Sequence, residues 1–148
     1  MKPQKEVEMI SPLMCLATAI YFEARNQPLE GQVAVAQVIL ERRDDPNYPD
    51  TVCSVVTAGG EHRNKCAFSF YCDGKPEKIV DEKAFFIAKS IAWNALNGHI
   101  NDATGGYATH YHASYVQPSW AVTLVPTKVI GDHIFYRKHG YKSWSGWE

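Results

Sequence analysis

A single glutamate, Glu23, is the first candidate for chemistry, because it ends an otherwise apolar stretch. The stretch reads Cys15-Leu-Ala-Thr-Ala-Ile-Tyr-Phe-Glu-Ala-Arg25 and is followed by the helix-breaking Asn26-Gln27-Pro28. Burying a charge among apolar side chains is costly, so the pKa of such a carboxyl is raised. A carboxylic acid with a raised pKa can act as a general acid near neutral pH. The alternative is that Glu23 only pairs with Arg25 or with another cation at the helix end.

Two histidines and two cysteines form a second candidate group. His110 and His112 are two positions apart, so a strand places both on the same face. Together with Cys66 and Cys72 they offer four ligands of the kinds that zinc prefers. The spacing of these cysteines does not match the close pairs of usual zinc sites. We therefore expect no metal and no cofactor, with one histidine hydrogen-bonded in a cleft wall and the other in solvent.

The four cysteines are expected to behave in two ways. Cys15 lies in the apolar stretch and Cys53 in a short apolar run, so both are predicted to be core thiols. Cys66 and Cys72 bracket five residues and are close enough to form a local disulfide. Such a bond would suit an oxidising compartment.

Helices are expected to position these groups. The first begins at Ser11-Pro12, a capping hydroxyl followed by a first-turn proline, and has an apolar stripe at helical spacing. The second is predicted over 29–43, and a third runs from near Asp81 to Gly98. A short helix capped by Asp50 or Thr51 lies between them. The stripe of the first helix consists of Leu13, Leu16, Ala17, Ile20 and Ala24.

The β portion is expected to be small. Residues 107–115 alternate in character and predict a strand, and 128–130 and 133–136 flank Gly131-Asp132, a turn pair typical of two-residue hairpins. Residues 59–80 are expected to be irregular, and the aromatic tail at 143–148 either packs or frays. The pattern therefore indicates an α+β domain that is mainly α.

Composition restricts the class of protein. The chain has 148 residues, 45% of them hydrophobic, which is enough for one domain with its own core. Fifteen Lys and Arg against 16 Asp and Glu argue against a nucleic-acid partner. No segment approaches the ~20 apolar residues of a membrane span. Residues 9–22 resemble a signal peptide, but Glu6 and Glu8 spoil its positive leader, so we expect a mature, soluble chain.

Five blocks, in this order, resemble the SleB/CwlJ-type cell-wall hydrolases, which include spore-cortex-lytic enzymes and phage lysins. The resemblance covers roughly residues 13–137. The blocks are Ala19-Ile-Tyr-Phe-Glu-Ala-Arg25, Glu30-Gly-Gln-Val-Ala-Val-Ala-Gln-Val-Ile-Leu40, Cys66-Ala-Phe-Ser-Phe-Tyr-Cys-Asp-Gly74, Ala108-Thr-His-Tyr-His-Ala113 and Ile130-Gly-Asp-His-Ile-Phe-Tyr-Arg137. Two departures stand out: Asn26-Gln27 replaces the usual Gly-Glu, and Leu40-Glu41-Arg42 replaces the usual Leu-Asn-Arg.

The resemblance implies a lysozyme-like single catalytic domain over 1–148 with a small β portion. It also implies cleavage of peptidoglycan between N-acetylmuramic acid (MurNAc) and N-acetylglucosamine (GlcNAc), with Glu23 as the catalytic acid. Most glycosidases use two carboxyl groups, and the possible partners are Glu30, Glu41, Glu61 and Asp73. None of these shares a short motif with Glu23. A lytic transglycosylase needs no partner, because the C6 hydroxyl of MurNAc attacks, and this mechanism is favoured.

Six further residues are candidates for binding the substrate, and the family that the chain resembles places a tyrosine at position 111. Ser69 would hold the acetamido group or Glu23, against a reading as a turn hydroxyl bonded to its own backbone. Aromatic residues would stack on sugars or line a cleft, although core aromatics are commoner, and Gln32 would reach the cleft from the start of the second helix. The full set is Ser69, Phe70, Tyr111, Trp120, Gln32 and His112.

The expected setting is the periplasm or the cell wall. Without a visible leader, the chain suits a phage lysin released by a holin, or a virion-borne enzyme, and a bacterial protein exported by other means is the alternative. We expect a monomer that acts on glycan strands. The rival functions are a hydrolytic muramidase using Glu41 or Asp73 as second carboxylate, and a non-catalytic glycan-binding module.

Overall fold

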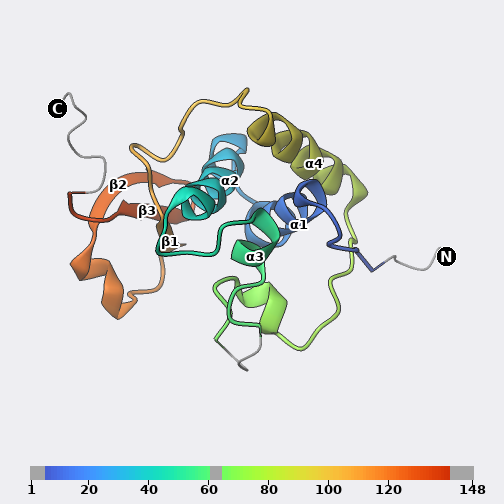
Figure 1. Ribbon diagram of the computed structural model, residues 1–148, viewed down its shortest axis with the longest axis horizontal. Helices are drawn as coiled ribbons and strands as arrows, with labels where there is room; N and C mark the ends of the chain where they lie inside the picture. Colours follow the sequence, from blue (N-terminus) through green and yellow to red (C-terminus); the bar gives the residue numbers. More distant parts are fainter. Residues whose placement is uncertain (1–5, 61–64, 141–148) are drawn as a thin grey trace.

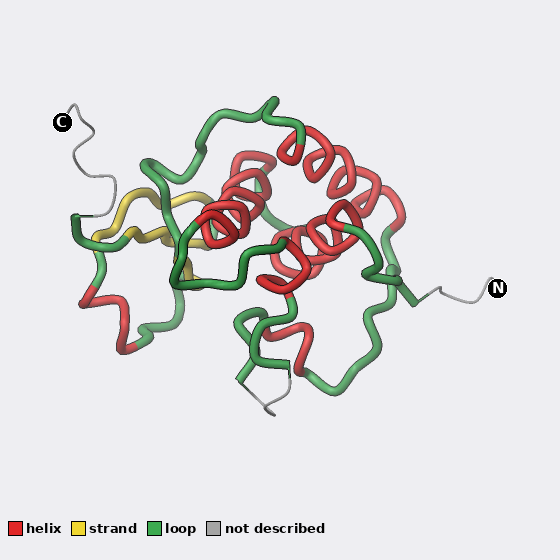
Figure 2. Tube along the Cα trace, viewed as in Figure 1, coloured by secondary structure: helices red, strands yellow, loops and turns green. Residues whose placement is uncertain are grey.

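The computed structural model describes residues 6–60 and 65–140, which form a helical part and a small antiparallel sheet (Figures 1 and 2). The α-helices gather on one side and the strands on the other. The helices are α1 (Pro12–Ala24), α2 (Leu29–Asp44), α3 (Val52–Val56) and α4 (Glu82–Leu96), with 3-10 helices η1 (Ser69–Cys72) and η2 (Ser119–Thr123). The strands are β1 (His110–Ala113), β2 (Val125–Ile130) and β3 (His133–Arg137). This confirms the predicted α+β class with mainly helical content.

Helix α1 lies at the centre of the helical part and packs against α2, α3 and α4. It begins where the sequence predicts, since the Ser11 hydroxyl accepts a hydrogen bond from the Met14 amide at 3.2 Å and Pro12 occupies the first turn. The buried polar Thr18 donates to the Met14 carbonyl at 2.6 Å. The buried residues of α1 are Cys15, Leu16, Ala17, Thr18, Ala19, Ile20, Tyr21 and Ala24. The end of α1 is therefore fixed by packing on several sides.

The other helix starts also have local causes. The Thr51 hydroxyl accepts from the Ser54 amide at 3.1 Å and caps α3, which selects Thr51 over Asp50. Asp81 caps α4 by accepting from the Ala84 amide at 3.0 Å. The Tyr21 hydroxyl accepts from the Asp81 amide at 3.0 Å, so the start of α4 is tied to α1.

The sheet has the order β1-β3-β2, and both pairs are antiparallel. Strands β2 and β3 form the predicted hairpin around Gly131-Asp132, with Ile130 opposite His133. Strand β1 is shorter than the predicted 107–115. Gly105, Gly106 and Tyr107 all have positive φ, so the extended conformation cannot begin before them.

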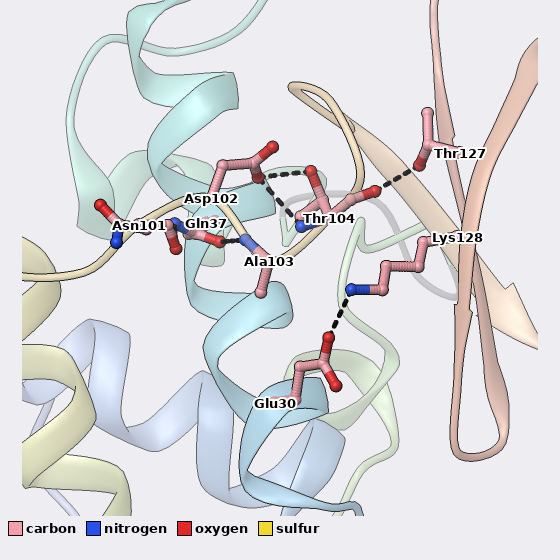
Figure 3. Close-up of polar contacts among 8 residues, drawn as sticks. All are labelled: Glu30, Gln37, Asn101, Asp102, Ala103, Thr104, Thr127 and Lys128. Carbon is pink, nitrogen blue, oxygen red and sulfur yellow. Dashed lines mark hydrogen bonds and ion pairs between the residues drawn. The ribbon is translucent and has the colours of Figure 1, made fainter.

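A polar network joins the segment before β1 to α2 and to β2 (Figure 3). On the α2 side, the Gln37 carboxamide donates to the Asn101 carbonyl at 2.6 Å and accepts from the Ala103 amide at 2.5 Å. On the β2 side, the Thr127 hydroxyl donates to the Thr104 carbonyl at 2.5 Å. These bonds fix the path by which the chain enters β1.

Two disulfides are present, and one of them corrects the sequence prediction. Cys15 of α1 and Cys53 of α3 are bonded, with their Cα atoms 5.2 Å apart, so they are not core thiols. The prediction was wrong because the two residues are 38 positions apart and meet only when α1 and α3 pack. The expected local bond between Cys66 and Cys72 is present, with Cα atoms 5.8 Å apart.

No helix within residues 6–60 and 65–140 has the length and apolar character to cross a membrane. Helix α2 carries Glu30 in its first turn and Arg42 and Arg43 in its last turn. The tail at 143–148 and the candidate carboxylate Glu61 lie outside the described residues.

Candidate active site

Glu23 lies in the last turn of α1, where its carboxylate meets strand β1. Its Oε1 accepts a hydrogen bond from the hydroxyl of Tyr111, a residue 88 positions away. Tyr111 is at the middle of β1, opposite Phe135 of β3. The site is therefore built from the end of the central helix and from the sheet.

The electrostatics around Glu23 fit an acid. Burial raises the pKa of Glu23, and the hydrogen bond from Tyr111 and the charge of Arg42 counteract part of this rise. Burial and the neighbouring Glu23 carboxylate hold the pKa of Tyr111 well above its usual value. Tyr111 therefore stays protonated and donates its hydrogen bond across the pH range in which Glu23 titrates.

Arg42 of α2 is a site residue that the sequence analysis missed. Its Nε donates to the Thr109 carbonyl at 2.7 Å, directly before β1. Its guanidinium lies over the rings of Tyr48 and Phe68, 5.2 and 5.5 Å from their centroids. A signal was present in the sequence, because Arg42 continues the apolar stripe of Val35, Val38 and Ile39 and a cation there needs partners.

Arg25 does not play the part that the alternative reading of Glu23 assigned to it. The guanidinium of Arg25 lies over the ring of Tyr21, 4.8 Å from the centroid. The charge that lowers the pKa of Glu23 comes from Arg42, on a different helix. The carboxylate of Glu23 is thus held by groups from β1 and α2 rather than by its sequence neighbour.

Tyr111 is fixed by aromatic neighbours on β3. Its ring lies 4.9 Å from that of His133 and 5.5 Å from that of Phe135, centroid to centroid. His133 is 8% exposed, and its Nδ1 is buried with no hydrogen-bond partner. Burial lowers the pKa of His133, which favours the neutral form of the ring that contacts Tyr111.

Ser69 and Phe70 lie in η1, on the α1 side of the site. The Phe70 ring stacks on the ring of Phe22, the residue before Glu23, with centroids 5.2 Å apart. Phe70 is 7% exposed, which gives it mainly a packing contact, while Ser69 is exposed. The structure thus brings η1 next to the end of α1 through the contact between Phe70 and Phe22.

Trp120 and His112 belong to a second aromatic cluster, between η2 and the sheet. The Trp120 ring lies 5.5 Å from His112 and 5.4 Å from Tyr136. His112 Nε2 and the Tyr136 hydroxyl are 2.7 Å apart, and the two rings stack. Gln32 lies apart from both clusters: it is 6% exposed and donates to the Gln27 carbonyl at 3.1 Å.

The four-ligand zinc arrangement is not formed. Cys66 and Cys72 are bonded to each other, so their thiolates are not free for a metal. His110 Nδ1 is 2.9 Å from the Thr109 hydroxyl, and His110 and His112 both contact the Trp120 ring. Both histidines are half-buried, so neither has the solvent position that was predicted for one of them.

The candidate second carboxylates have other surroundings. Glu30 pairs with Lys128 of β2 at the surface (Figure 3). Asp73 is exposed and accepts from the Lys75 amide at 2.8 Å. Glu41 lines a hollow of about 240 Å³ between α2 and the segment 100–108. Glu23 instead accepts its hydrogen bond from a tyrosine, Tyr111.

Comparisons with known proteins agree with one another. The profile of the Cell Wall Hydrolase family matches residues 26–136. A spore cortex-lytic enzyme of Halalkalibacterium halodurans is 35% identical over 83% of this chain and 34% of that protein. One of Bacillus subtilis is 32% identical over 81% of this chain and 35% of that protein. The chain thus spans about a third of the length of these relatives.

Two solved structures share the fold. The catalytic domain of the SleB protein of Bacillus cereus superposes with a TM-score of 0.66 at 34% identity, covering 85% of this chain and 89% of that domain. The catalytic domain of the germination-specific lytic transglycosylase SleB of Bacillus anthracis gives 0.67 at 32% identity, covering 88% and 97%. The expected lysozyme-like α+β fold is therefore the fold of this chain.

Proposed function

Since the chain belongs to the Cell Wall Hydrolase family, we propose that it is a lytic transglycosylase that cleaves the MurNAc–GlcNAc bond of peptidoglycan. The observation that carries the proposal is Glu23, a carboxyl whose pKa burial raises and whose Oε1 accepts from Tyr111. One solved relative is itself described as a lytic transglycosylase. Residues 1–148 form the proposed catalytic domain.

In the first step Glu23 acts as a general acid. The Tyr111 hydroxyl donates to Oε1, so the acidic proton sits on Oε2. Glu23 transfers this proton to the glycosidic oxygen, the bond from that oxygen to C1 of MurNAc breaks, and the GlcNAc side leaves as an alcohol. The 2-acetamido group of MurNAc stabilises the positive charge that develops at C1.

In the second step the same residue acts as a base. The Glu23 carboxylate accepts the proton of the C6 hydroxyl of MurNAc while the C6 oxygen bonds to C1. The product is a 1,6-anhydro-MurNAc end, water is not consumed, and Glu23 is again protonated. Arg42 favours the carboxylate form that exists between the two steps, because its charge lowers the pKa of Glu23. One carboxyl group therefore suffices.

The two disulfides support action outside the cytoplasm. Cys15–Cys53 and Cys66–Cys72 hold α1 to α3 and close η1, and such bonds persist in oxidising compartments. We infer that the chain acts as a monomer in the periplasm or cell wall.

Product analysis on purified sacculi tests the proposal. Wild type and Glu23→Gln are incubated with sacculi, and the soluble muropeptides are identified by mass spectrometry. We expect 1,6-anhydro ends from wild type and a loss of at least about 100-fold for Glu23→Gln, the range of a missing general acid. Circular dichroism confirms that the variant is folded.

Three results would contradict the proposal. Reducing MurNAc ends without anhydro ends would identify a muramidase that uses water and a second carboxylate, with Glu41 or Asp73 as its candidate. Sacculus lysis that survives in folded Glu23→Gln would show that Glu23 is not the acid. Binding without any bond cleavage by wild type would identify a glycan-binding module.

A further inference from the structure

We propose that Gln27 is a positioning residue that fixes the end of α1 against the sheet and so holds Glu23 in register with Tyr111. This inference rests on the proposed function of Glu23. Gln27 is four residues beyond Glu23, in the connection between α1 and α2. Its side chain contacts the β2–β3 turn, which is more than 100 positions away in the sequence.

The contact between Gln27 and Asp132 uses both ends of the carboxamide. Gln27 Nε2 donates to Asp132 Oδ2 at 3.2 Å. Gln27 Oε1 accepts from the backbone amide of Asp132 at 2.9 Å. A carboxamide suits this position because it presents a donor to the carboxylate and an acceptor to the N–H at the same time.

The backbone of Gln27 is held on the helical side. Its amide donates to the Ala24 carbonyl at 2.9 Å, at the end of α1. Its carbonyl accepts from Nε2 of the buried Gln32 in the first turns of α2, at 3.1 Å. Gln27 therefore cannot shift without disturbing the last turn of α1 or the start of α2. Gln32, predicted as a cleft residue, has this supporting contact instead.

The turn that Gln27 contacts is held on the sheet side. Gly131 has a left-handed φ of 55°, and a Cβ at this position would collide with Gln27 Oε1 and with Pro28. The carbonyl of Asp132 accepts from the Ser114 amide at 2.7 Å, directly after β1. The turn is thus fixed to the strand that carries Tyr111.

Glu23 and Tyr111 are consequently joined by two routes. The direct route is the hydrogen bond between their side chains. The indirect route runs from α1 through Gln27 to Asp132, and from Asp132 to the end of β1. Loosening the indirect route leaves the acid to be aligned by one hydrogen bond alone, and small misplacements of a reacting group are costly in rate.

The identity of residue 27 has an electrostatic consequence. The family that this chain resembles usually has glutamate at this position. A carboxylate at residue 27 could not donate a hydrogen bond to Asp132, and it would place two anions in contact. The charged and titratable groups on the packed elements include Asp132 in the turn, His133 on β3, His112 on β1, Arg25 after α1, and the Glu30–Lys128 pair between α2 and β2. Gln27 therefore gives this chain a contact whose strength does not depend on protonation of residue 27.

The test is a double-mutant cycle with Gln27→Glu, Asp132→Asn and the two combined, measured from pH 4.5 to 8. The readouts are the maximal rate of anhydro-muropeptide release, the sacculus concentration at half-maximal rate, and the thermal midpoint. We expect Gln27→Glu to lower the maximal rate at pH 7.5 by about threefold to tenfold, which corresponds to one lost hydrogen bond. The loss of rate relative to wild type should shrink at lower pH, because protonation of either carboxyl restores a donor between residues 27 and 132.

The double variant supplies the rescue. An asparagine at 132 donates to the new carboxylate, so Gln27→Glu/Asp132→Asn should return to within about twofold of Asp132→Asn. Glu30→Gln is the matched control, since it changes one carboxyl nearby without touching Asp132, and its pH profile should follow wild type. The sacculus concentration at half-maximal rate should change little in all variants, because the substitutions affect the alignment of Glu23 rather than the binding of substrate.

Three results would overturn the inference. The first is a Gln27→Glu variant with the wild-type rate across the pH range. The second is a double variant no better than Gln27→Glu, and the third is a fall in thermal midpoint without any fall in maximal rate. Failure of the proposed function would be detected in a different experiment, as cleavage retained by Glu23→Gln. In that case the thermal midpoints of the double-mutant cycle would still measure the contact between residues 27 and 132.

Discussion

The hydroxyl of Tyr111 donates a hydrogen bond to Oε1 of Glu23. This bond connects the middle of β1 to the last turn of α1. This bond favours the carboxylate form of Glu23, whereas burial favours the protonated form and has the larger effect. The balance leaves the pKa of Glu23 raised. An acid that must lose and regain a proton in one catalytic cycle benefits from such opposing influences.

Tyr111→Phe should shift the pH profile of the reaction upward. Without the hydroxyl, the carboxylate loses a donor, so the pKa of Glu23 rises further. Activity needs protonated Glu23 for the first step, so the alkaline limb of the rate profile should move to higher pH. The maximal rate should fall by about tenfold to 100-fold, because the carboxyl loses its alignment. Initial rates on sacculi from pH 4.5 to 9 measure both effects.

Tyr115→Phe is the matched control for this change. Tyr115 is 84% exposed and follows β1 by two residues, so removing its hydroxyl should leave the profile unchanged. A Tyr111→Phe variant whose alkaline limb moves to lower pH would contradict the role given to the hydroxyl.

Glu23→Gln should make the folded protein more stable at neutral pH. The pKa of Glu23 is raised on folding, so the folded state binds more protons than the unfolded chain between the two pKa values. The associated stability is present below the unfolded pKa and is lost as the pH rises through the folded pKa. Glutamine mimics the neutral acid and avoids this loss. Thermal midpoints should therefore be higher than wild type at pH 7 and equal to it near pH 4.

The exposed Glu30→Gln serves as the comparison for this stability effect. It removes a surface ion pair with Lys128, which is worth between zero and about 1 kcal/mol, so it should give no gain at pH 7. A Glu23→Gln variant less stable than wild type at pH 7 would show that the carboxylate form is the better accommodated one.

Arg42→Met should destabilise the fold by about 1–3 kcal/mol, the cost of a buried polar group left without its partner. The Thr109 carbonyl loses the donor from Arg42, and Thr109 is fully buried. Arg42→Lys keeps the charge but not the planar stacking on Tyr48 and Phe68, so it should restore stability only in part. Urea unfolding with an unchanged slope measures the difference.

Arg43→Met provides the neighbouring control. Arg43 pairs with Asp44 at the surface, and such pairs contribute little, so the expected cost is below about 0.5 kcal/mol. Equal losses for Arg42→Met and Arg43→Met would contradict the structural role of Arg42.

The parts of the fold that the sequence predicted are those with local causes. Ser11-Pro12 and Asp81 mark helix starts through their own capping groups, and Gly131-Asp132 marks a hairpin through its turn geometry. Each of these signals acts within a few residues of the structure that it specifies. The helices and the β2–β3 hairpin could therefore be placed within a few residues of their observed bounds.

The remaining features depend on contacts between distant segments. The hydrogen bond of Tyr111 to Glu23 joins residues 88 positions apart, and the contact of Gln27 with Asp132 joins residues 105 positions apart. No periodicity specifies such pairs, because they follow from how β1 and the hairpin pack beside α1. The resemblance to a family indicated Glu23 as the acid, but its surroundings required the structure.

The two disulfides should differ in how much they stabilise the chain. Cys15–Cys53 closes a loop of 38 positions and Cys66–Cys72 one of six. By loop entropy, the first is worth about 4 kcal/mol and the second about 2 kcal/mol. Urea unfolding of Cys15→Ala/Cys53→Ala and Cys66→Ala/Cys72→Ala, each against wild type under oxidising conditions, measures the two contributions. A Cys15→Ala/Cys53→Ala variant as stable as wild type would contradict the larger contribution assigned to this bond.

For activity we expect the opposite order: loss of the Cys66–Cys72 bond should lower the rate more than loss of the Cys15–Cys53 bond. The Cys66–Cys72 bond closes η1, whose Phe70 stacks on Phe22 beside Glu23, so its loss disturbs the site more than the whole fold. We expect Cys66→Ala/Cys72→Ala to lose several-fold in the maximal rate of anhydro-product release while remaining folded at 25 °C. Cys15→Ala/Cys53→Ala, measured at a temperature where it is still folded, should keep most of its rate, because α1 remains packed against α2 and α4. A variant pair with the reverse order of rates would mean that the α1–α3 link, rather than η1, aligns Glu23.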